Sequence, residues 1–253
     1  MDAPWADLEA LKRTLTDTHE RTAPDHEDED PARFLRGFVE HYIQGRALTM
    51  LPRQRLDQLQ AAVDDVLEDG IPGDLIETGA WRGGATILMR AVLAARGVSD
   101  RRVWVADSFQ GLPQPDAESF PLEARAHQSR TMVEVYEHFA VSEDEVRANF
   151  ERFGLLDEQV RFLPGWFEQT LPGAPIEHLA LMRLDGDYYA STLQALESLY
   201  PRLSPGGYVI VDDYGERGWT YCARAVDEFR ERVGAREPLV SVDSKCVYWR
   251  RAD

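Results

Sequence analysis

The stretch DLIETGAWRGGATILMRAVLAARG, residues 74–97, decides the fold class. It begins with a short apolar run that is typical of a buried strand, and its glycines mark a tight turn before a helical pattern that ends at Gly97. A second apolar run, RRVWVAD at 101–107, follows closely. A strand, a helix and a strand in this order predict a parallel βαβ unit in a sheet that is covered by helices.

The same alternation continues along the chain. HLALMRLDGD at 178–187 predicts a strand, STLQALESLYPRL at 191–203 a helix, and GGYVIVDDY at 206–214 a further strand. Apolar positions at helical spacing come before the first strand, so we expect residues 1–70 to form a helical extension and residues 71–253 to form one α/β domain. These patterns predict a mostly parallel sheet with helices on both faces.

The bulk composition excludes several classes of partner. The 253 residues, 43% of them hydrophobic, fit one α/β domain with a helical extension. The net charge of −17 opposes binding to nucleic acids and to anionic membranes. No apolar run reaches the roughly 18 residues of a membrane span, and the N-terminus has no apolar segment of signal length. We therefore expect a cytoplasmic protein, and its two cysteines, which lack metal-binding spacing, agree with a reducing compartment.

The turn after the first strand has the character of a ligand-binding loop. Its sequence, Glu77-Thr78-Gly79-Ala80-Trp81-Arg82-Gly83-Gly84, has a G-x-x-x-G-G spacing that differs from the G-x-G-x-x-G of dinucleotide-binding folds. A carboxylate before the turn suits a cationic ligand better than a pyrophosphate, and S-adenosylmethionine carries an ammonium and a sulfonium. Asp107, at the end of the second strand, can accept two hydrogen bonds from a ribose diol. The alternative is a structural turn with a capping aspartate.

Two close pairs of aspartates follow two of the predicted strands. Asp185 and Asp187 end one strand, and Asp212 and Asp213 end another. The chain between them is long enough for a helical crossover, so the strands should be parallel and their carboxyl ends should share one edge, where ligands bind in open α/β sheets. Converging carboxylates suit Mg²⁺, and we expect Asp185, Asp212 and Asp213 to be its ligands. The neighbours Asp212 and Asp213 can both bind only if the backbone leaves the strand between them.

Asp187 lies two residues beyond one predicted ligand and can point at a substrate. The pKa of a hydroxyl falls when Mg²⁺ binds it, and a carboxylate within about 3 Å can then accept the proton as a general base. The alternative is that Asp187 caps the helix that begins near Ala190.

Five motifs, ETGAWRGGA, WVADSFQGLP, VRFLPGWFEQTLP, RLDGDYYAST and PRLSPGGYVIVDDY, together resemble the macrocin and mycinamicin O-methyltransferase family from about Thr49 to Arg250. Members of this family act on deoxysugars of macrolides and related natural products. The resemblance implies a class I methyltransferase fold, which is Rossmann-like with a mostly parallel seven-stranded sheet. It also implies S-adenosylmethionine as donor, a catalytic Mg²⁺, and a homo-oligomer, dimeric or larger, that forms through the N-terminal helices.

Carried over position by position, the resemblance implies contacts to each part of the cofactor. Glu77, Gly79 and Arg82 are expected around its methionine end, with Asp107 and Ser108 at the ribose. Gly165 and Trp166 are expected near the adenine, and the segment LTM lies over the cofactor. The full expected cofactor-binding set is Thr49, Met50, Glu77, Thr78, Gly79, Arg82, Gly83, Asp107, Ser108, Gly165, Trp166 and Asp185. The resemblance implies the same metal ligands as the chemistry and the same base, Asp187.

A Pro-rich and charged stretch at about 112–142 is expected to be a lid insertion, and it matches no one enzyme of the family. His127 and His138 could reach a substrate from it. The leading prediction is methylation, dependent on S-adenosylmethionine and Mg²⁺, of a sugar hydroxyl of a glycosylated natural product in antibiotic biosynthesis. The alternatives are a catechol-like phenol acceptor, a nicotinamide-dependent oxidoreductase, and a non-catalytic binding module.

Overall fold

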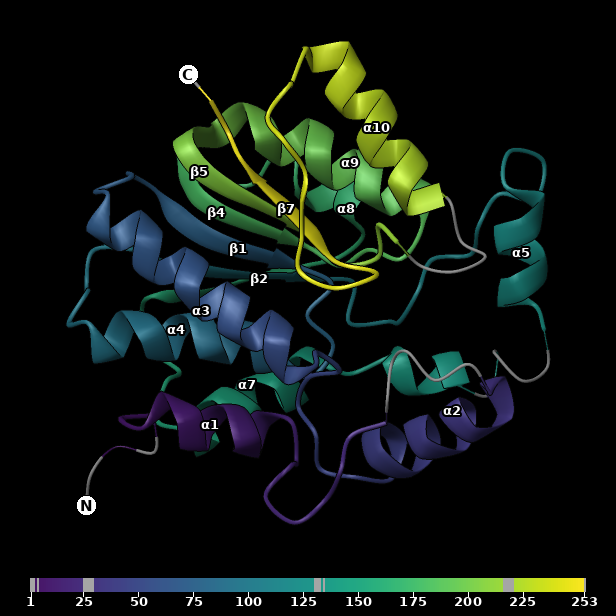
Figure 1. The fold of residues 1–253 in the computed structure, drawn as a ribbon, viewed down its shortest axis with the longest axis horizontal. Coiled ribbons are helices and arrows are strands. Elements are labelled where there is room, and N and C mark those ends of the chain that lie inside the picture. The colour runs from purple at the N-terminus through teal and green to yellow at the C-terminus, as the bar shows by residue number, and fades with distance from the viewer. Residues whose placement is uncertain are drawn as a thin grey trace.

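An open sheet forms the centre of the computed structural model, which describes residues 3, 5–24, 30–129, 133, 135–215 and 221–252 (Figure 1). The strands in this described part of the chain are β1 (Asp74–Thr78), β2 (Val103–Asp107), β3 (Val160–Pro164), β4 (Leu179–Leu184), β5 (Leu203–Val211), β6 (Val240–Ser241) and β7 (Val247–Arg250). Their order across the sheet is β3-β2-β1-β4-β5-β7-β6. β1 to β5 pair in parallel, and β7 runs antiparallel to β5 and to β6. The mostly parallel, seven-stranded sheet that we predicted is therefore confirmed.

Helices cover both faces of this sheet (Figure 1). One face carries α1 (Leu8–Leu15), α3 (Arg53–Glu68), α4 (Gly84–Ala95) and α7 (Glu143–Arg152), and the other carries α8 (Phe167–Thr170), α9 (Tyr189–Leu199) and α10 (Tyr221–Val233). β1 shows how the sheet joins the two layers, because Leu75 packs into the first core and Ile76 into the second, and neither is exposed. Burial on both faces explains why the central strands appear in the sequence as predominantly apolar runs.

The helices before β1 belong to the same body as the sheet. They are α1, α2 (Pro31–Phe38) with the π-helical turn η1 (Val39–Ile43), and α3. Asp7 caps α1, since its Oδ1 accepts hydrogen bonds from the N–H groups of Glu9 and Ala10, both at 3.0 Å. α3 follows Pro52, and the chain turns at Gly70, where φ is +65°. Leucines and valines of α3 lie in the core that α4 shares, so the predicted extension packs directly against the α/β domain.

A further layer lies beyond the carboxyl ends of the central strands. It contains α2, α5 (Pro121–His127) and the 3₁₀ turn η2 (Glu137–Phe139), which Figure 1 shows at one end of the sheet. The expected lid insertion at 112–142 provides α5 and η2, but residues 130–132 and 134 lie outside the described residues. A second 3₁₀ turn, η3 (Tyr200–Arg202), leads into β5. After α10, the β6–β7 hairpin adds the last two strands beside β5. In the part of the chain that the structure describes, no helix is both long enough and apolar enough to span a bilayer.

Candidate active site

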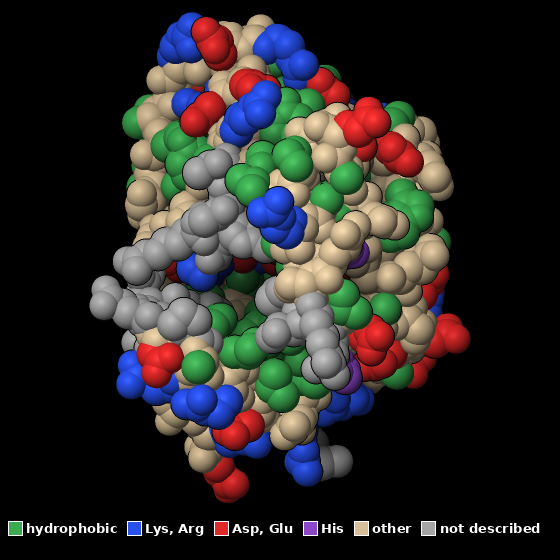
Figure 2. Space-filling view, turned by 90° about the vertical axis from the view of Figure 1, so that its right-hand side faces the viewer, with side chains coloured by type: hydrophobic (Ala, Val, Ile, Leu, Met, Phe, Trp, Pro, Cys, Tyr) green, Lys and Arg blue, Asp and Glu red, His purple; other side chains and the backbone are tan. Residues whose placement is uncertain are grey.

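A cavity of about 820 Å³ opens where the carboxyl ends of β1, β2, β4 and β5 face α2 and α5. Figure 2 looks onto this side of the molecule, where hydrophobic side chains gather around a hollow. Strand order reverses between β1 and β4, so the cavity lies at the topological switch point of the sheet. We call the residues at the strand ends the cavity floor: Gly79, Asp107, Asp185, Asp187, Asp212 and Asp213. We call the facing rings the aromatic wall: Phe34, Phe38, Tyr136 and Phe139.

The glycine turn after β1 brings backbone close to the cavity. Gly79 has a φ of +83°, and a Cβ at this position would lie 1.7 Å from the carbonyl oxygen of Asp185, so only glycine fits. Asp107 holds the turn from the end of β2, because its Oδ2 accepts hydrogen bonds from the N–H groups of Ala80 at 2.8 Å and Trp81 at 3.2 Å. The turn is therefore fixed against β2 by a side chain that itself lines the cavity.

Asp107 and Ser108, the residues predicted at the ribose, both line the cavity. Burial raises the pKa of Asp107, although three backbone N–H groups, with Phe109 as the third at 2.8 Å, favour its charged form. A carboxylate has about four acceptor positions, so this one retains capacity for a ligand hydroxyl. The hydroxyl of Ser108 donates to the carbonyl oxygen of Gly111 at 2.8 Å.

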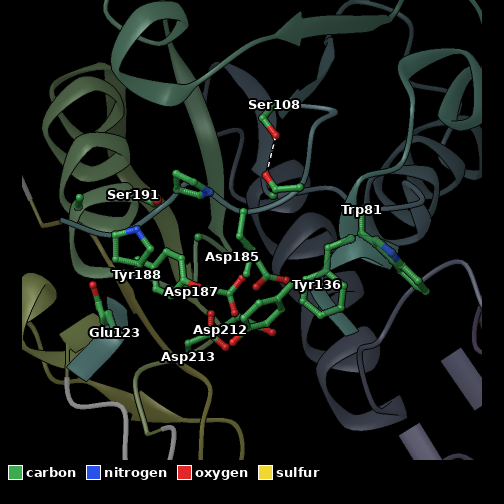
Figure 3. Close-up of a pocket in the computed structure, with 18 of the residues that line it drawn as sticks. Trp81, Ser108, Glu123, Tyr136, Asp185, Asp187, Tyr188, Ser191, Asp212 and Asp213 are labelled. Carbon is green, nitrogen blue, oxygen red and sulfur yellow. Dashed lines mark hydrogen bonds between the residues drawn. The ribbon is translucent and has the colours of Figure 1, made fainter. Parts of the chain in front are cut away.

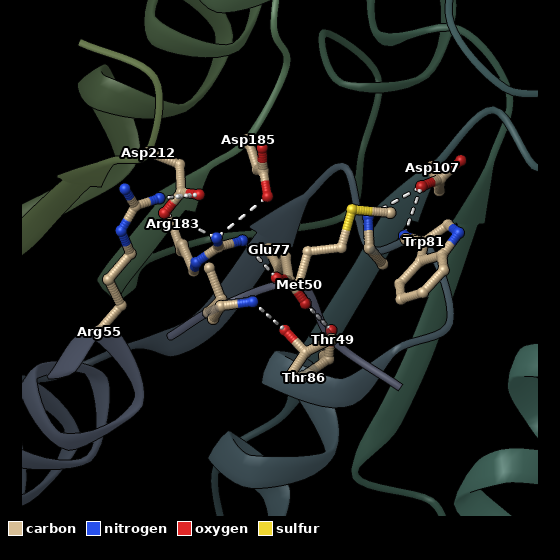
Figure 4. Close-up of polar contacts among 12 residues, drawn as sticks. Thr49, Met50, Arg55, Glu77, Trp81, Thr86, Asp107, Arg183, Asp185 and Asp212 are labelled. Atoms are coloured by element: carbon tan, nitrogen blue, oxygen red, sulfur yellow. Dashed lines mark hydrogen bonds and ion pairs between the residues drawn. The ribbon is translucent and has the colours of Figure 1, made fainter. Parts of the chain in front are cut away.

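Glu77 lies in a buried polar cluster rather than on the cavity surface (Figure 4). Its side chain is 2% exposed, and its Oε1 accepts a hydrogen bond from Arg183 Nη1 at 2.5 Å, while Thr86 donates to its other oxygen. Burial raises the pKa of Glu77 to about 7, although the guanidinium of Arg183 favours the charged form. A contact between Glu77 and the methionine end of a cofactor stays a prediction.

The predicted cofactor residues fall into two groups, those that line the cavity and those that do not. Met50, Gly79, Asp107, Ser108, Trp166 and Asp185 line the cavity, whereas Thr49, Glu77, Thr78, Arg82, Gly83 and Gly165 are not among its lining residues. Arg82 illustrates the second group, because its Nη1 donates to the carbonyl oxygens of Tyr42 at 3.0 Å and Ala47 at 2.9 Å. It fastens the N-terminal segment to the glycine turn, and any contact with a cofactor stays a prediction.

The structure brings the three predicted metal ligands together (Figure 3). β4 ends at Leu184 and β5 at Val211, so the backbone leaves β5 before Asp212, one residue earlier than the predicted exit between Asp212 and Asp213, and both side chains can face one point. One carboxylate oxygen from each of Asp185, Asp212 and Asp213 lies within 4.8 Å of the others. This is a spacing from which three hard oxygen ligands can bind one cation.

Charge is distributed unevenly in this cluster. Burial opposes ionisation of Asp212, but the charges of Arg183 and Arg55 outweigh it and lower its pKa. Arg55 Nη1 donates to Asp212 Oδ2 at 2.7 Å, and Arg183 Nη2 lies 2.8 Å from Oδ1 as an ion pair without hydrogen-bond geometry. Burial, together with the charges of the neighbouring aspartates, raises the pKa of Asp213 well above its ordinary value. Two adjacent carboxylates thus have opposite surroundings.

Asp213 also supplies the test of whether a metal fits. Its Oδ2 is buried, and among the described residues no group forms a hydrogen bond with it. Burial and the charge of Asp212 likewise raise the pKa of Asp185, to about 6. A divalent cation would supply the positive charge that these carboxylates need and would bond the unpaired oxygen, so the residues present fit Mg²⁺.

Asp187 occupies a tight turn beside this cluster. Its φ is +58°, and the N–H of Tyr188 donates to the carbonyl oxygen of Gly186 at 2.6 Å, which makes Asp187 the centre of a γ-turn. Tyr188 holds the N-cap position of α9, and the N–H of Tyr189 donates to Glu123 Oε1 at 3.0 Å. The capping position that we considered for Asp187 therefore belongs to another residue, and Asp187 lines the cavity.

Sequence reasoning missed the aromatic wall. Phe38 lies 5.9 Å from Phe34 and 6.4 Å from Phe139, and Phe139 lies 5.5 Å from Tyr136, measured between ring centroids. The rings come from α2 and from residues 136–139, two segments that are far apart in the sequence. Aromatic residues in such segments give no signal until the fold places them together.

Sequence reasoning also missed the two buried arginines. Arg183 carries a detectable signal, because a single charge within the apolar run HLALMRLDGD demands a buried partner. Arg55 has no comparable signal in α3.

The two lid histidines have different surroundings. The Nδ1 of His127 lies 2.7 Å from the hydroxyl of Tyr188, and its ring stacks on Tyr136 with centroids 5.3 Å apart. His138 contributes its carbonyl oxygen, which accepts a hydrogen bond from Trp81 Nε1 at 3.1 Å. Only the side chain of His127 is thus linked to the residues that follow Asp187.

Comparison with known proteins places these features in a family. The model of the macrocin O-methyltransferase (TylF) family matches residues 2–251. The chain is 50% identical over 252 residues to the 8-demethyl-8-(2,3-dimethoxy-alpha-L-rhamnosyl)-tetracenomycin-C 4'-O-methyltransferase of Streptomyces olivaceus, covering 96% of this chain and 91% of that protein. It is 49% identical over 208 residues to the mycinamicin III 3''-O-methyltransferase of Micromonospora griseorubida, covering 81% and 79% of the two chains.

A solved structure agrees with these relatives. The structure of the O-methyltransferase NovP superimposes with a TM-score of 0.83 at 43% identity and covers 97% of this chain and 98% of its own. These comparisons confirm the predicted family resemblance, the class I methyltransferase fold and the class of enzyme, an O-methyltransferase.

Proposed function

Because the chain belongs to the macrocin O-methyltransferase family, we propose that it transfers a methyl group from S-adenosylmethionine to a sugar hydroxyl of a glycosylated natural product during antibiotic biosynthesis. The names of two relatives support this acceptor class, since one names a rhamnosyl tetracenomycin and the other mycinamicin III. The observation that carries the proposal is the cluster of Asp185, Asp212 and Asp213 on the cavity floor, with Asp187 beside it. One Asp213 oxygen in this cluster has no hydrogen-bond partner among the described residues.

The cofactor would lie against the ends of β1 and β2. When bound, S-adenosylmethionine supplies a methyl group on a positively charged sulfur. Gly79 allows close approach of the backbone, and Asp107 and Ser108 offer acceptor oxygens for the ribose. Met50 and Trp166 line the same cavity and provide apolar surface. Other predicted cofactor residues would support the site from behind the cavity lining: Thr49, Thr78, Arg82, Gly83 and Gly165.

Asp185, Asp212 and Asp213 would hold Mg²⁺. When bound, this ion supplies a positive charge that orients an acceptor hydroxyl and lowers its pKa. Arg183 and Arg55 keep Asp212 ionised and fix the position of its carboxylate. The proposed metal ligands and the Asp187 carboxylate therefore lie side by side on the cavity floor.

Asp187 would act as the general base. It accepts the proton of the acceptor hydroxyl while the oxygen forms a bond to the methyl carbon and the bond between that carbon and sulfur breaks, which leaves S-adenosylhomocysteine as a neutral thioether. Orientation of the two substrates in the cavity and stabilisation of charge would contribute most of the acceleration. Self-association through the N-terminal helices and a cytoplasmic location stay predictions.

One observation favours a second acceptor class. A flat phenol needs apolar or aromatic surroundings, and the aromatic wall provides them. A catechol-like acceptor therefore stays as the second candidate, while the spacing of the glycine turn and the four aspartates argue against a nicotinamide-dependent oxidoreductase.

The test is methyl transfer from labelled S-adenosylmethionine into a panel of deoxysugar-bearing natural products and simple catechols, each with Mg²⁺ and with EDTA. We expect transfer to a glycoside that EDTA abolishes. Transfer to catechols alone would mean that the acceptor is a phenol and not a sugar hydroxyl. Transfer that survives EDTA would refute the metal role of the aspartates. No transfer to any acceptor, with no binding of S-adenosylmethionine by calorimetry, would refute the proposed function.

A further inference from the structure

The backbone at Asp187 is strained, so contacts from surrounding residues must hold it in this conformation. A positive φ is uncommon for a residue other than glycine, and a γ-turn with positive φ at its centre is rare. Such a conformation is strained and persists only when its surroundings determine it. The residues that fix this turn therefore also fix the direction of the Asp187 carboxylate.

Helix α5 contacts both residues that follow the turn, Tyr188 and Tyr189. Glu123 accepts a hydrogen bond from the N–H of Tyr189 at 3.0 Å, and the Nδ1 of His127 lies 2.7 Å from the hydroxyl of Tyr188. Phe120, which directly precedes α5, stacks on the ring of Tyr189 with centroids 4.9 Å apart. Both Tyr188 and Tyr189 are thus held by one short helix from a distant part of the chain.

Glu123 is suited to a fixed contact of this kind. Its side chain is 1% exposed, although it carries a carboxylate, and it approaches the first turn of α9, where backbone N–H groups lack partners within the helix. Figure 3 shows Glu123 close to Tyr188, on the same side of the cavity as Asp187. His127 is also held in place, since it stacks on Tyr136 of the aromatic wall.

We propose that α5 positions the general base, and that Glu123 and His127 are positioning residues of the methyl transfer which act through Tyr188 and Tyr189 on Asp187. This inference rests on the proposed function and assigns to the lid a task besides covering the acceptor. A displacement of about 1 Å in a reacting group can cost about 100-fold in rate, so loss of either contact should be measurable in turnover.

Three variants and one control test the contacts. Glu123→Leu removes the acceptor at similar size, whereas Glu123→Gln keeps an acceptor oxygen; His127→Phe keeps an aromatic ring and removes the nitrogen. Leu122→Ala is the control, since Leu122 lies on the same helix and is 58% exposed. We expect Glu123→Leu and His127→Phe to lower kcat about tenfold or more, with the acceptor KM and the Kd of S-adenosylmethionine and Mg²⁺ changed less than threefold. Glu123→Gln and Leu122→Ala should stay within threefold of wild type.

A double-mutant cycle separates positioning from a merely structural role. In an Asp187→Asn background, measured by single turnover with labelled S-adenosylmethionine, adding Glu123→Leu or His127→Phe should cost less than twofold, because the base on which they act is gone. Equal losses in both backgrounds, or an unchanged kcat in both single variants, would overturn the inference while leaving the proposed function intact. If wild-type protein transfers no methyl group, the proposed function fails first and the inference fails with it.

Discussion

The cavity floor and the aromatic wall face each other across one cavity but are built in opposite ways. Apart from Gly79, the floor consists of carboxylates at or just beyond the ends of parallel strands, which the sheet brings to one edge. The wall consists of rings from α2 and from residues 136–139, which pack against one another in tilted and T-shaped pairs. The contrast teaches that, in this chain, the charged side and the aromatic side of the cavity come from different parts of the fold and can be altered separately.

The largest effect that tests this contrast should come from the floor. Asp187→Asn keeps the size of the side chain and removes its ability to accept a proton as a base. We expect kcat to fall about 100- to 10,000-fold, which is the range of general acid–base catalysis. The Kd values of S-adenosylmethionine and Mg²⁺, measured by calorimetry, should change less than threefold. Turnover within threefold of wild type would remove Asp187 from the reaction.

A second test concerns the stability of the floor. Arg183 is 2% exposed and contacts Glu77, Asp185 and Asp212, so Arg183→Met leaves buried carboxylates without their cation. We expect the free energy of unfolding, measured with urea, to fall by about 3–5 kcal/mol.

An exposed ion pair provides the matched control for that measurement. Arg232 pairs with Glu197 at 2.6 Å, and about half of each side chain is exposed, so Arg232→Met should change the free energy of unfolding by less than about 1 kcal/mol. Similar losses in the two variants would mean that the buried cluster contributes no special stability.

The smallest effect should come from the wall. Phe38 contacts Phe34 and Phe139 in the aromatic wall, so Phe38→Ala should raise the acceptor KM about 3- to 10-fold, as expected for loss of one aromatic contact of about 0.5–1.5 kcal/mol. We expect kcat to change less than twofold, with the exposed Val233→Ala on α10 as the control. A fall in kcat at constant KM would show that the wall takes part in the chemistry, and the contrast would fail.

The sheet and its floor could be predicted because their signals are local. Each buried parallel strand appears as one apolar run, and a helical crossover between parallel strands brings their carboxyl ends to one edge. Asp185, Asp212 and Asp213 therefore could be grouped from their positions after two such runs, and the structure places them together. Roles for these residues stay predictions, because geometry alone does not identify a bound ion.

The wall, the α5 contacts and the arginine partners could not be predicted, because their signals are not local. Phe38 and Phe139 belong to segments whose docking depends on the whole fold. Glu77 shows the same limit, since a carboxylate before a glycine turn favoured a cationic ligand, and the structure gives that carboxylate a cation from β4, Arg183. A charge inside an apolar run was the only available sign of that pairing.

Arg55 carries a consequence for protein engineering. It belongs to α3, before the first strand, yet its guanidinium bonds Asp212 at the end of β5 and Asp243 in the β6–β7 hairpin, at 2.7 and 2.6 Å. A chimera joined near residue 70, designed to exchange acceptor preference by swapping N-terminal segments between relatives, would also exchange one of the two cations that neutralise Asp212. Such a graft should work only when the donor segment brings an arginine to the same place, so the useful crossover point is set by electrostatics rather than by the end of α3.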